Sequence, residues 1–456
     1  MRLARWQIGA RKATPMPFLK RLFWVYFLLL IFEGALRKWI LPQLSAPLLL
    51  VRDPVALLII WEAYRTHKWP RQWSGVIGIL AVGMLALCFV QLVVGENPWF
   101  VALYGLRSYL LPFPVAFVMG ENLSREDLRK FGLCTLWLLL PLVALEVAQY
   151  SSPPSSFLNA GSYAGLQQIS YAAGHVRASA TFSFVTGPAL YMPLAAAFIF
   201  YGFVDDKFAS RWLLWTASSA LILAVPVTGS RGMVLSLSEV LAVVAIAAMF
   251  GVTQLVSSLK VIGTILVIAL AVSQLPLFSE ATSTFMERFT LASASEGGTT
   301  GTLNSRVGLP ILLAVEDSIS STDLFGNGIG LGSLAAAKLL TGTPQFLAGE
   351  GEFARVISEF GGPFGIAFML FRILLAIMIA AKAFSRVREH EPLALFLVPL
   401  MFTNVITGIL EQPTIQGFTV VSVAFSIAAL NRSPSLSKAA PSTNANLVRA
   451  SSGSGT

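Results

Sequence analysis

Apolar stretches long enough to cross a membrane follow one another along almost the whole chain of 456 residues. A membrane-spanning helix needs about 20 mostly apolar residues. Only 12% of the residues are charged, whereas soluble domains carry about 25%. The abundance of large apolar residues also excludes a disordered chain. We therefore predict an all-α, polytopic integral membrane protein with about 12 transmembrane helices and a large extracytoplasmic loop between spans 9 and 10.

The twelve predicted spans divide the chain into five parts. They centre on 21–41, 46–63, 75–94, 99–119, 131–150, 183–203, 211–227, 232–251, 257–276, 354–381, 393–410 and 415–431. The resulting parts are a basic cytoplasmic N-terminal tail (1–20), transmembrane helices 1–9 (21–276), the large extracytoplasmic loop (277–352), transmembrane helices 10–12 (353–431) and a disordered cytoplasmic tail (432–456).

The distribution of Lys and Arg predicts the orientation. Of the 32 basic residues, 21 lie in the two tails and in alternate connections between spans. Cytoplasmic loops carry such an excess. We expect both termini in the cytoplasm. The net charge of +9 is then explained by topology, and no nucleic-acid partner is needed.

Two connections predicted to face outward are longer than the others. One runs from about 151 to 182 and contains the lone His175. The other, 277–352, contains the apolar patches 307–315 and 334–340, so we expect it to fold against the membrane surface. Loops of this length are usually functional or disordered. The two cysteines, Cys88 and Cys134, lie inside apolar runs and indicate neither a disulfide framework nor a metal site.

Eleven basic residues lie on the predicted outer side or in spans near it, where orientation does not explain them. An arginine in the membrane costs about 2.5–3.5 kcal/mol on insertion scales, so it is normally paired or used. Glu33 and Arg37 are four residues apart, and Arg52 adjoins Asp53. Such spacing favours a packed ion-pair network over a functional site for these four residues.

Arg231 stands in a polar hinge, Thr228-Gly229-Ser230-Arg231-Gly232, with no acidic residue following it before Glu239. A guanidinium at the outer rim suits a planar anion such as phosphate, which accepts two parallel hydrogen bonds. The alternative is an interfacial arginine whose head group reaches water.

A group of carboxylates precedes the tenth predicted span. Glu352, Arg355 and Glu359 share one helix face by their spacing, and Glu350 stands just before the helix begins. A partly desolvated carboxylate there can act as a general base. The alternative is a cluster at a helix N-terminus, favoured by the helix dipole.

The segment 326–333, Gly-Asn-Gly-Ile-Gly-Leu-Gly-Ser, does not satisfy the nucleotide-binding pattern GxGxxG. It is better interpreted as a tight loop whose bare backbone lies close to another part of the chain or to a ligand.

Four segments together resemble the O-antigen ligase and O-antigen polymerase superfamily of membrane glycosyltransferases. In the family's order they are 177–182 (Arg-Ala-Ser-Ala-Thr-Phe), 228–232, the pair 304–306 and 324–330, and 359–361 (Glu-Phe-Gly). The resemblance covers about 177–410. One position departs from the pattern: Glu350 stands where the family usually has histidine, nine residues before Glu359.

The resemblance implies a metal-independent, inverting transfer of a glycan from an undecaprenyl-pyrophosphate donor, without a cofactor. The acceptor would be a lipid-linked glycan, for a polymerase, or a lipid A–core sugar, for a ligase. Arg231 and Arg306 would bind the pyrophosphate, with Arg177 and Arg288 as second choices. Glu350 would be the base, with Glu352 as its substitute. A transporter or flippase of lipid-linked oligosaccharides and a non-catalytic scaffold are the alternatives. A transporter should lack a long, ordered outer loop, and a scaffold leaves the outer arginines unexplained.

Overall fold

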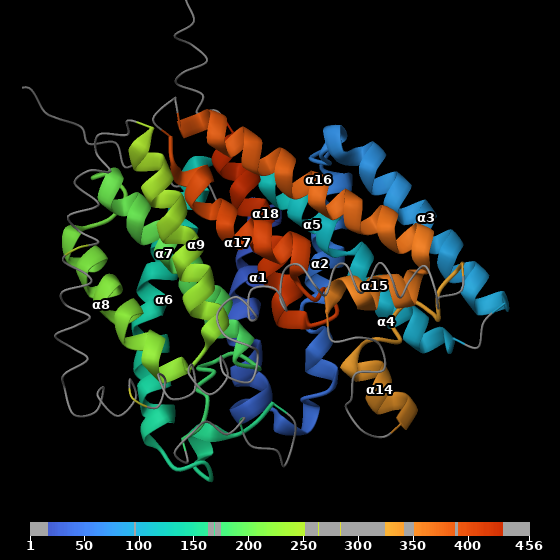
Figure 1. Ribbon diagram of the computed structural model, residues 1–456, viewed down its shortest axis with the longest axis horizontal. Helices are drawn as coiled ribbons and strands as arrows, with labels where there is room; N and C mark the ends of the chain where they lie inside the picture. Colours follow the sequence, from blue (N-terminus) through green and yellow to red (C-terminus); the bar gives the residue numbers. More distant parts are fainter. Residues whose placement is uncertain are drawn as a thin grey trace, which may run out of the picture.

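The computed structural model of the protein is a bundle of helices (Figure 1). It describes residues 17–94, 97–162, 168, 175–250, 263, 283, 324–341, 351–387 and 391–431. Within these ranges, eight helices are long and apolar enough to cross a membrane. They are Arg71–Val94, Trp99–Asn122, Arg125–Ser151, Thr186–Val204, Arg211–Thr228, Arg231–Met249, Gly362–Val387 and Pro413–Leu430. The all-α, polytopic architecture predicted from the sequence is confirmed to this extent.

The helices are labelled as in Figure 1. The first half contains α1 (Phe18–Ala35), the π-helix η1 (Leu36–Ile40), η2 (Pro42–Leu44), η3 (Pro47–Leu50), α2 (Asp53–Arg65), η4 (Arg71–Trp73), α3 (Ser74–Val94), α4 (Trp99–Leu110), α5 (Pro112–Asn122), α6 (Arg125–Ser151) and η5 (Phe157–Asn159). The second half contains α7 (Thr186–Val204), α8 (Arg211–Thr228), α9 (Arg231–Met249), α14 (Leu334–Thr341), α15 (Glu352–Phe360), α16 (Gly362–Val387), α17 (Leu393–Thr407) and α18 (Pro413–Leu430).

Helix α18 occupies the centre of the bundle. It packs against α5, α17 and α7, and nearly all of its side chains are buried. Helix α3 lies at the periphery and exposes Ile79, Val82 and Phe89. Large apolar side chains in this position suit contact with lipid.

The predicted span over 354–381 is present as Gly362–Val387. Its predicted start is wrong, because the chain turns at Gly361. Helix α15 ends there with φ +82°, a left-handed conformation that glycine adopts without strain. A Cβ atom on Gly361 would lie only 2.2 Å from the carbonyl oxygen of Leu324. Pro363 then stands in the first turn of α16, where proline is well tolerated. The short helix α15 therefore points in its own direction.

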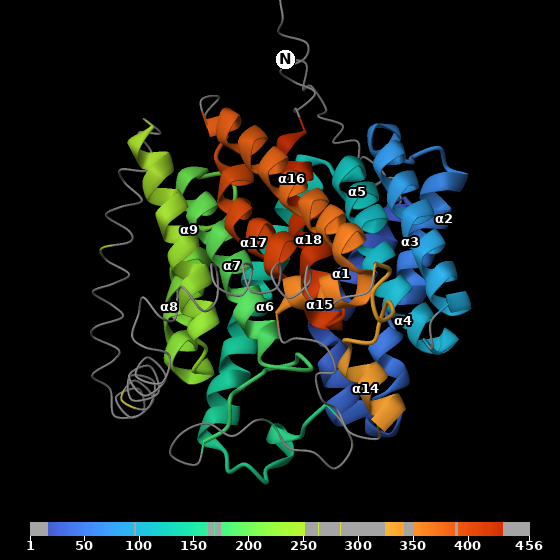
Figure 2. The same cartoon turned by 45° about the vertical axis from the view of Figure 1, so that its right-hand side comes forward.

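Several of the predicted cytoplasmic connections meet at one end of the bundle. Arg125 at the start of α6 pairs with Glu391 before α17, and Arg129 donates a hydrogen bond to the carbonyl of Lys207 between α7 and α8 at 2.7 Å. The α6–α7 connection and α14 lie at the opposite end (Figure 2). This grouping agrees with the alternation of basic connections. The described residues do not determine which end of the bundle faces the cytoplasm. The predicted span 257–276 and most of the loop 277–352 lie outside the described residues.

Candidate functional site

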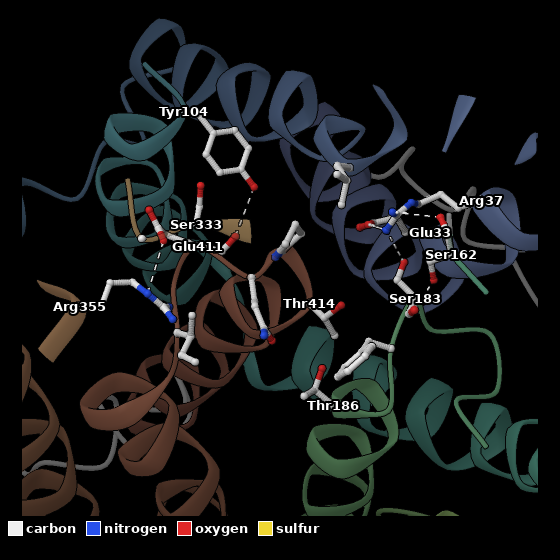
Figure 3. A pocket seen from close by; sticks show the side chains of 16 residues that line it. Glu33, Arg37, Tyr104, Ser162, Ser183, Thr186, Ser333, Arg355, Glu411 and Thr414 are labelled. Carbon is white, nitrogen blue, oxygen red and sulfur yellow. Dashed lines mark hydrogen bonds and ion pairs between the residues drawn. The ribbon is translucent and has the colours of Figure 1, made fainter. Parts of the chain in front are cut away.

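A cavity of about 170 Å³ lies where the ends of several helices meet. Its walls come from the end of α1 and η1, from α4, from the start of α7, from α15 and from the connection between α17 and α18. Arg355 and Glu411 lie at one side and Glu33 and Arg37 at the other (Figure 3). Hydroxyl side chains, including Thr186 and Thr414, lie between them. The cavity therefore presents two cations, two carboxylates and several hydrogen-bonding groups to one space.

Arg37 is held in place by backbone and side-chain acceptors. Its Nε donates to the carbonyl of Ser45 at 2.8 Å, and its Nη1 donates to Oγ of Ser183 at 2.9 Å. Oε1 of Glu33 lies 3.7 Å from Nη1, and both side chains are almost fully buried. These contacts fix the guanidinium at the wall of the cavity.

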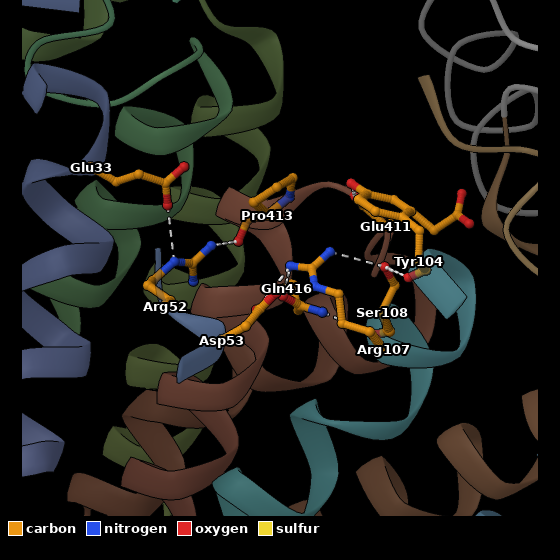
Figure 4. A network of polar contacts seen from close by, with 9 residues as sticks. All are labelled: Glu33, Arg52, Asp53, Tyr104, Arg107, Ser108, Glu411, Pro413 and Gln416. Atoms are coloured by element: carbon orange, nitrogen blue, oxygen red, sulfur yellow. Dashed lines mark hydrogen bonds and ion pairs between the residues drawn. The ribbon is translucent and has the colours of Figure 1, made fainter. Parts of the chain in front are cut away.

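A polar network behind this wall supports Glu33 (Figure 4). Nε of Arg52 donates to Oε2 of Glu33 at 3.0 Å. The sequence suggested that Asp53 pairs with its neighbour Arg52, but it does not. It accepts from Arg107 on α4, whose Nη2 donates to Oδ1 at 3.1 Å. Arg52 also donates to the carbonyl of Pro413 at the start of α18. The packed ion-pair network predicted for this region is therefore present. The Glu33–Arg37 pair is as predicted, whereas Arg52 and Asp53 have other partners.

The other side of the cavity rests on a chain of buried ion pairs. Nε of Arg355 lies 3.7 Å from Oε2 of Glu411, and Nη1 lies 3.7 Å from Oε2 of Glu352. Glu352 in turn pairs with Arg372 on α16. All four side chains are at most 2% exposed. The predicted common face of Glu352, Arg355 and Glu359 is buried and faces α16, the glycine-rich loop and Glu411.

Glu359 anchors the glycine-rich loop. Its Oε2 accepts from the backbone N–H of Gly330 at 3.0 Å, and its Oε1 accepts from that of Gly332 at 2.6 Å. The loop also approaches α4 closely, because a Cβ atom on Gly330 would lie 2.4 Å from the carbonyl oxygen of Val101. The prediction that bare backbone lies close to another part of the chain is confirmed here.

Burial raises the pKa of two carboxyl groups at this side of the cavity. For Glu411 the rise is strengthened by the nearby negative charge of Glu359 and opposed by Arg355. For Glu359 burial raises the pKa to about 7, against the effect of the Gly330 and Gly332 N–H donors. Both groups therefore hold protons more firmly than an exposed carboxyl does.

The hinge that contains Arg231 is a helix corner. Gly229 ends α8 with φ +57°, and Oγ of Ser230 accepts from the backbone N–H of Met233 at 3.3 Å, capping α9. Arg231 is the first residue of α9 and is half-buried. It does not line the cavity described above.

The remaining predicted site residues are placed as follows. Glu352 is buried between Arg355 and Arg372 and does not line the cavity. Arg177 is half-buried in the connection before α7 and does not line it either. Glu350, Arg306 and Arg288 lie outside the described residues.

Glu411 is the site residue that sequence reasoning missed. It stands in the short connection Leu410-Glu411-Gln412-Pro413, which contains no basic residue. An acidic residue in an apolar connection predicted to face outward was the available signal. Among the residues that the structure describes, no group of His, Cys, Asp and Glu side chains is arranged to hold a metal ion.

No family model matches the chain, and no curated protein is significantly similar to it.

Proposed function

We propose that the protein is a membrane glycosyltransferase of cell-surface polysaccharide assembly. It transfers a glycan from an undecaprenyl-pyrophosphate donor to a lipid-linked glycan or a lipid A–core sugar, on the outer face of the bacterial inner membrane. Two independent lines support the proposal. One is the ordered set of four motifs between residues 177 and 361. The other is a cavity in which arginines and carboxylates face the same space.

The cavity is the observation that carries the proposal. Arg37 and Arg355 offer planar donors of the kind that bind phosphate oxygens. Fixed cations beside a leaving pyrophosphate lower the barrier, because they stabilise the negative charge that develops there. The hydroxyl groups of Thr186, Thr414 and Ser333 suit the hydrogen bonding of a sugar. Arg231 and Arg306 are proposed to contact the pyrophosphate, with Arg177 and Arg288 as second choices.

The test is a reaction with purified components. The protein is placed in lipid nanodiscs and supplied with lipid-linked oligosaccharide extracted from cells that lack it, in a buffer containing EDTA. We expect equal amounts of lengthened lipid-linked glycan and free undecaprenyl pyrophosphate, measured by mass spectrometry. If the acceptor is lipid A–core, lengthening appears only when that acceptor is added.

The same material tests the transporter alternative. In proteoliposomes, a flippase would move lipid-linked oligosaccharide between leaflets without releasing pyrophosphate. Movement without any glycan product would contradict the proposal and favour a transporter.

A further inference from the structure

Glu411 differs from the other carboxylates around the cavity in how its oxygens are used. Glu359 accepts from two backbone N–H groups, Glu352 accepts from Arg372, and Glu33 accepts from Arg52. Within the described part of the chain, neither carboxylate oxygen of Glu411 accepts a hydrogen bond from an arginine, a hydroxyl or a backbone N–H. The carboxyl group of Glu359 is close enough to share a proton with it. The contact of Glu411 with Arg355, at 3.7 Å, is an ion pair beyond hydrogen-bond distance. Glu411 is only 4% exposed and lines the cavity.

A buried carboxylate without hydrogen-bond donors is costly, so a ligand that supplies one is favoured. A sugar hydroxyl in the cavity would supply such a donor. We therefore expect a hydroxyl group of the substrate to face Glu411. Glu411 can accept a hydrogen bond from this hydroxyl and then take its proton.

The backbone around Glu411 is held firmly. The hydroxyl of Tyr104 donates to the carbonyl of Glu411 at 3.4 Å, and the N–H of Gln412 donates to the carbonyl of Ile409 at 3.0 Å. Pro413 starts α18 directly afterwards and accepts from Arg52. Positions fixed in this way suit a group that must meet a reacting atom.

We infer that Glu411 is the catalytic base that takes the proton from the acceptor hydroxyl, an inference that rests on the proposed glycosyl transfer. The acceptor oxygen forms a bond to the anomeric carbon of the donor sugar. The bond between that carbon and the pyrophosphate oxygen breaks, and undecaprenyl pyrophosphate leaves with the electron pair. The hydroxyl proton passes to Glu411, from which it is later lost to water.

This assignment differs from the one that the sequence motif suggests. The register of the motif points to Glu350, which lies outside the described residues. Glu352 is already committed to Arg355 and Arg372. Among the described residues, Glu33 and Glu411 both line the cavity with unused acceptor capacity, but Glu33 has one such oxygen and Glu411 has two.

The charged surroundings of Glu411 predict how activity depends on pH. Arg355, Glu352 and Glu359 face it from α15, and Tyr104 and Tyr109 stand on α4. Burial and the two neighbouring carboxylates raise the pKa of Glu411, and Arg355 opposes them. A base works only when deprotonated, so activity should rise with pH through this raised pKa.

The test compares three Gln variants in the nanodisc reaction with lipid-linked oligosaccharide as the probe. Glu411→Gln keeps the shape of the side chain and leaves Arg355 paired with Glu352. We expect a fall in kcat of about 10²–10⁴-fold, with KM for the donor little changed and the rise of activity with pH abolished. Glu391→Gln is the matched control at the other end of the bundle and should behave as wild type. Glu350→Gln tests the rival base.

The outcomes are distinct. If wild type forms no product, the proposed function fails, and the inference fails with it. If wild type is active and Glu411→Gln matches it, or keeps its pH dependence, the inference alone is overturned. A dead Glu350→Gln beside an active Glu411→Gln assigns the base to Glu350. If Glu411→Gln loses activity, two measurements show whether the cause is the lost base or a folding defect. An unchanged melting temperature of Glu411→Gln and retained activity of Glu411→Asp indicate that the base was lost. If Glu411→Gln does not fold, Glu411→Asp decides the question. An inactive Glu411→Asp enzyme would then count against the inference.

Discussion

Arg372 in α16 pairs with Glu352 in the first turn of α15, and both side chains are at most 1% exposed. The same arginine donates from Nη2 to the carbonyl of Gly408 at 2.7 Å. The pair therefore joins α15, α16 and the connection after α17, on which Arg355 and Glu411 depend for their positions. It also gives Glu352 a structural role through a partner on α16 that the sequence did not suggest.

Removing one partner of this pair should destabilise the protein strongly. Arg372→Met leaves the buried charge of Glu352 without the closer of its two arginine partners among the described residues, and such losses cost about 3–5 kcal/mol. We expect a clearly lower melting temperature in detergent, followed by tryptophan fluorescence. The double variant Arg372→Met with Glu352→Gln removes both charges and should recover part of the loss. A single variant as stable as wild type would contradict the buried pairing.

The close contact between α4 and the glycine-rich loop makes a second prediction. A Cβ atom on Gly105 would lie 2.4 Å from Cα of Gly330, so Gly105→Ala must push the loop away from α4. Hydrogen exchange of the segment 326–332 should become faster, and transfer activity should fall. Gly83→Ala on α3 is the control, because nothing lies within 4 Å of its added Cβ atom. Equal exchange in the two variants would argue against this contact.

The sequence predicted the all-α, polytopic class, because spanning helices depend mainly on apolar length, which is a local property. The predicted spans 21–41, 46–63 and 393–410 are not among the eight described helices that are long and apolar enough to cross a membrane. The prediction also failed at Gly361, where composition stays apolar but a left-handed glycine turns the chain. The sequence also suggested a pair between Arg52 and its neighbour Asp53. In the structure Arg52 pairs with Glu33 and Asp53 pairs with Arg107, both of which lie on other helices. Partners separated by 19 and 54 residues follow from tertiary packing and have no local pattern. Glu411 was missed for the same reason, since only the fold brings it to Arg355.

The predicted orientation is testable with single cysteines in a variant that lacks Cys88 and Cys134. Ser155, exposed between α6 and α7, and Ser385, exposed near the end of α16, lie at opposite ends of the bundle. We expect Ser155→Cys to react with an impermeant thiol reagent in intact spheroplasts. Ser385→Cys should react only after permeabilisation. The reverse pattern would place the cavity on the cytoplasmic side and contradict the proposed function.

Arg231 begins α9, where a cation lies at the unfavourable end of the helix dipole. Under the proposed function Arg231 contacts the pyrophosphate of the donor, so Arg231→Ala should abolish glycan transfer while the protein still inserts and expresses. Arg231→Lys should also be poor, because an ammonium lacks the two parallel donors. The measurement is polymer or ligated product on complemented cells. Normal product from the alanine variant would exclude the pyrophosphate role.

The central claim is that the lipid-linked glycan reacts in the cavity between Arg37 and Arg355. Thr186→Trp places a large ring at the cavity wall without removing a charged group. Leu374→Trp, at a side chain 64% exposed on α16, is the matched control. The direct measurement is the rate at which each variant in nanodiscs releases undecaprenyl pyrophosphate from lipid-linked oligosaccharide. We expect Thr186→Trp to lose release while it folds normally, and Leu374→Trp to match wild type. Release at the wild-type rate from Thr186→Trp would contradict the account.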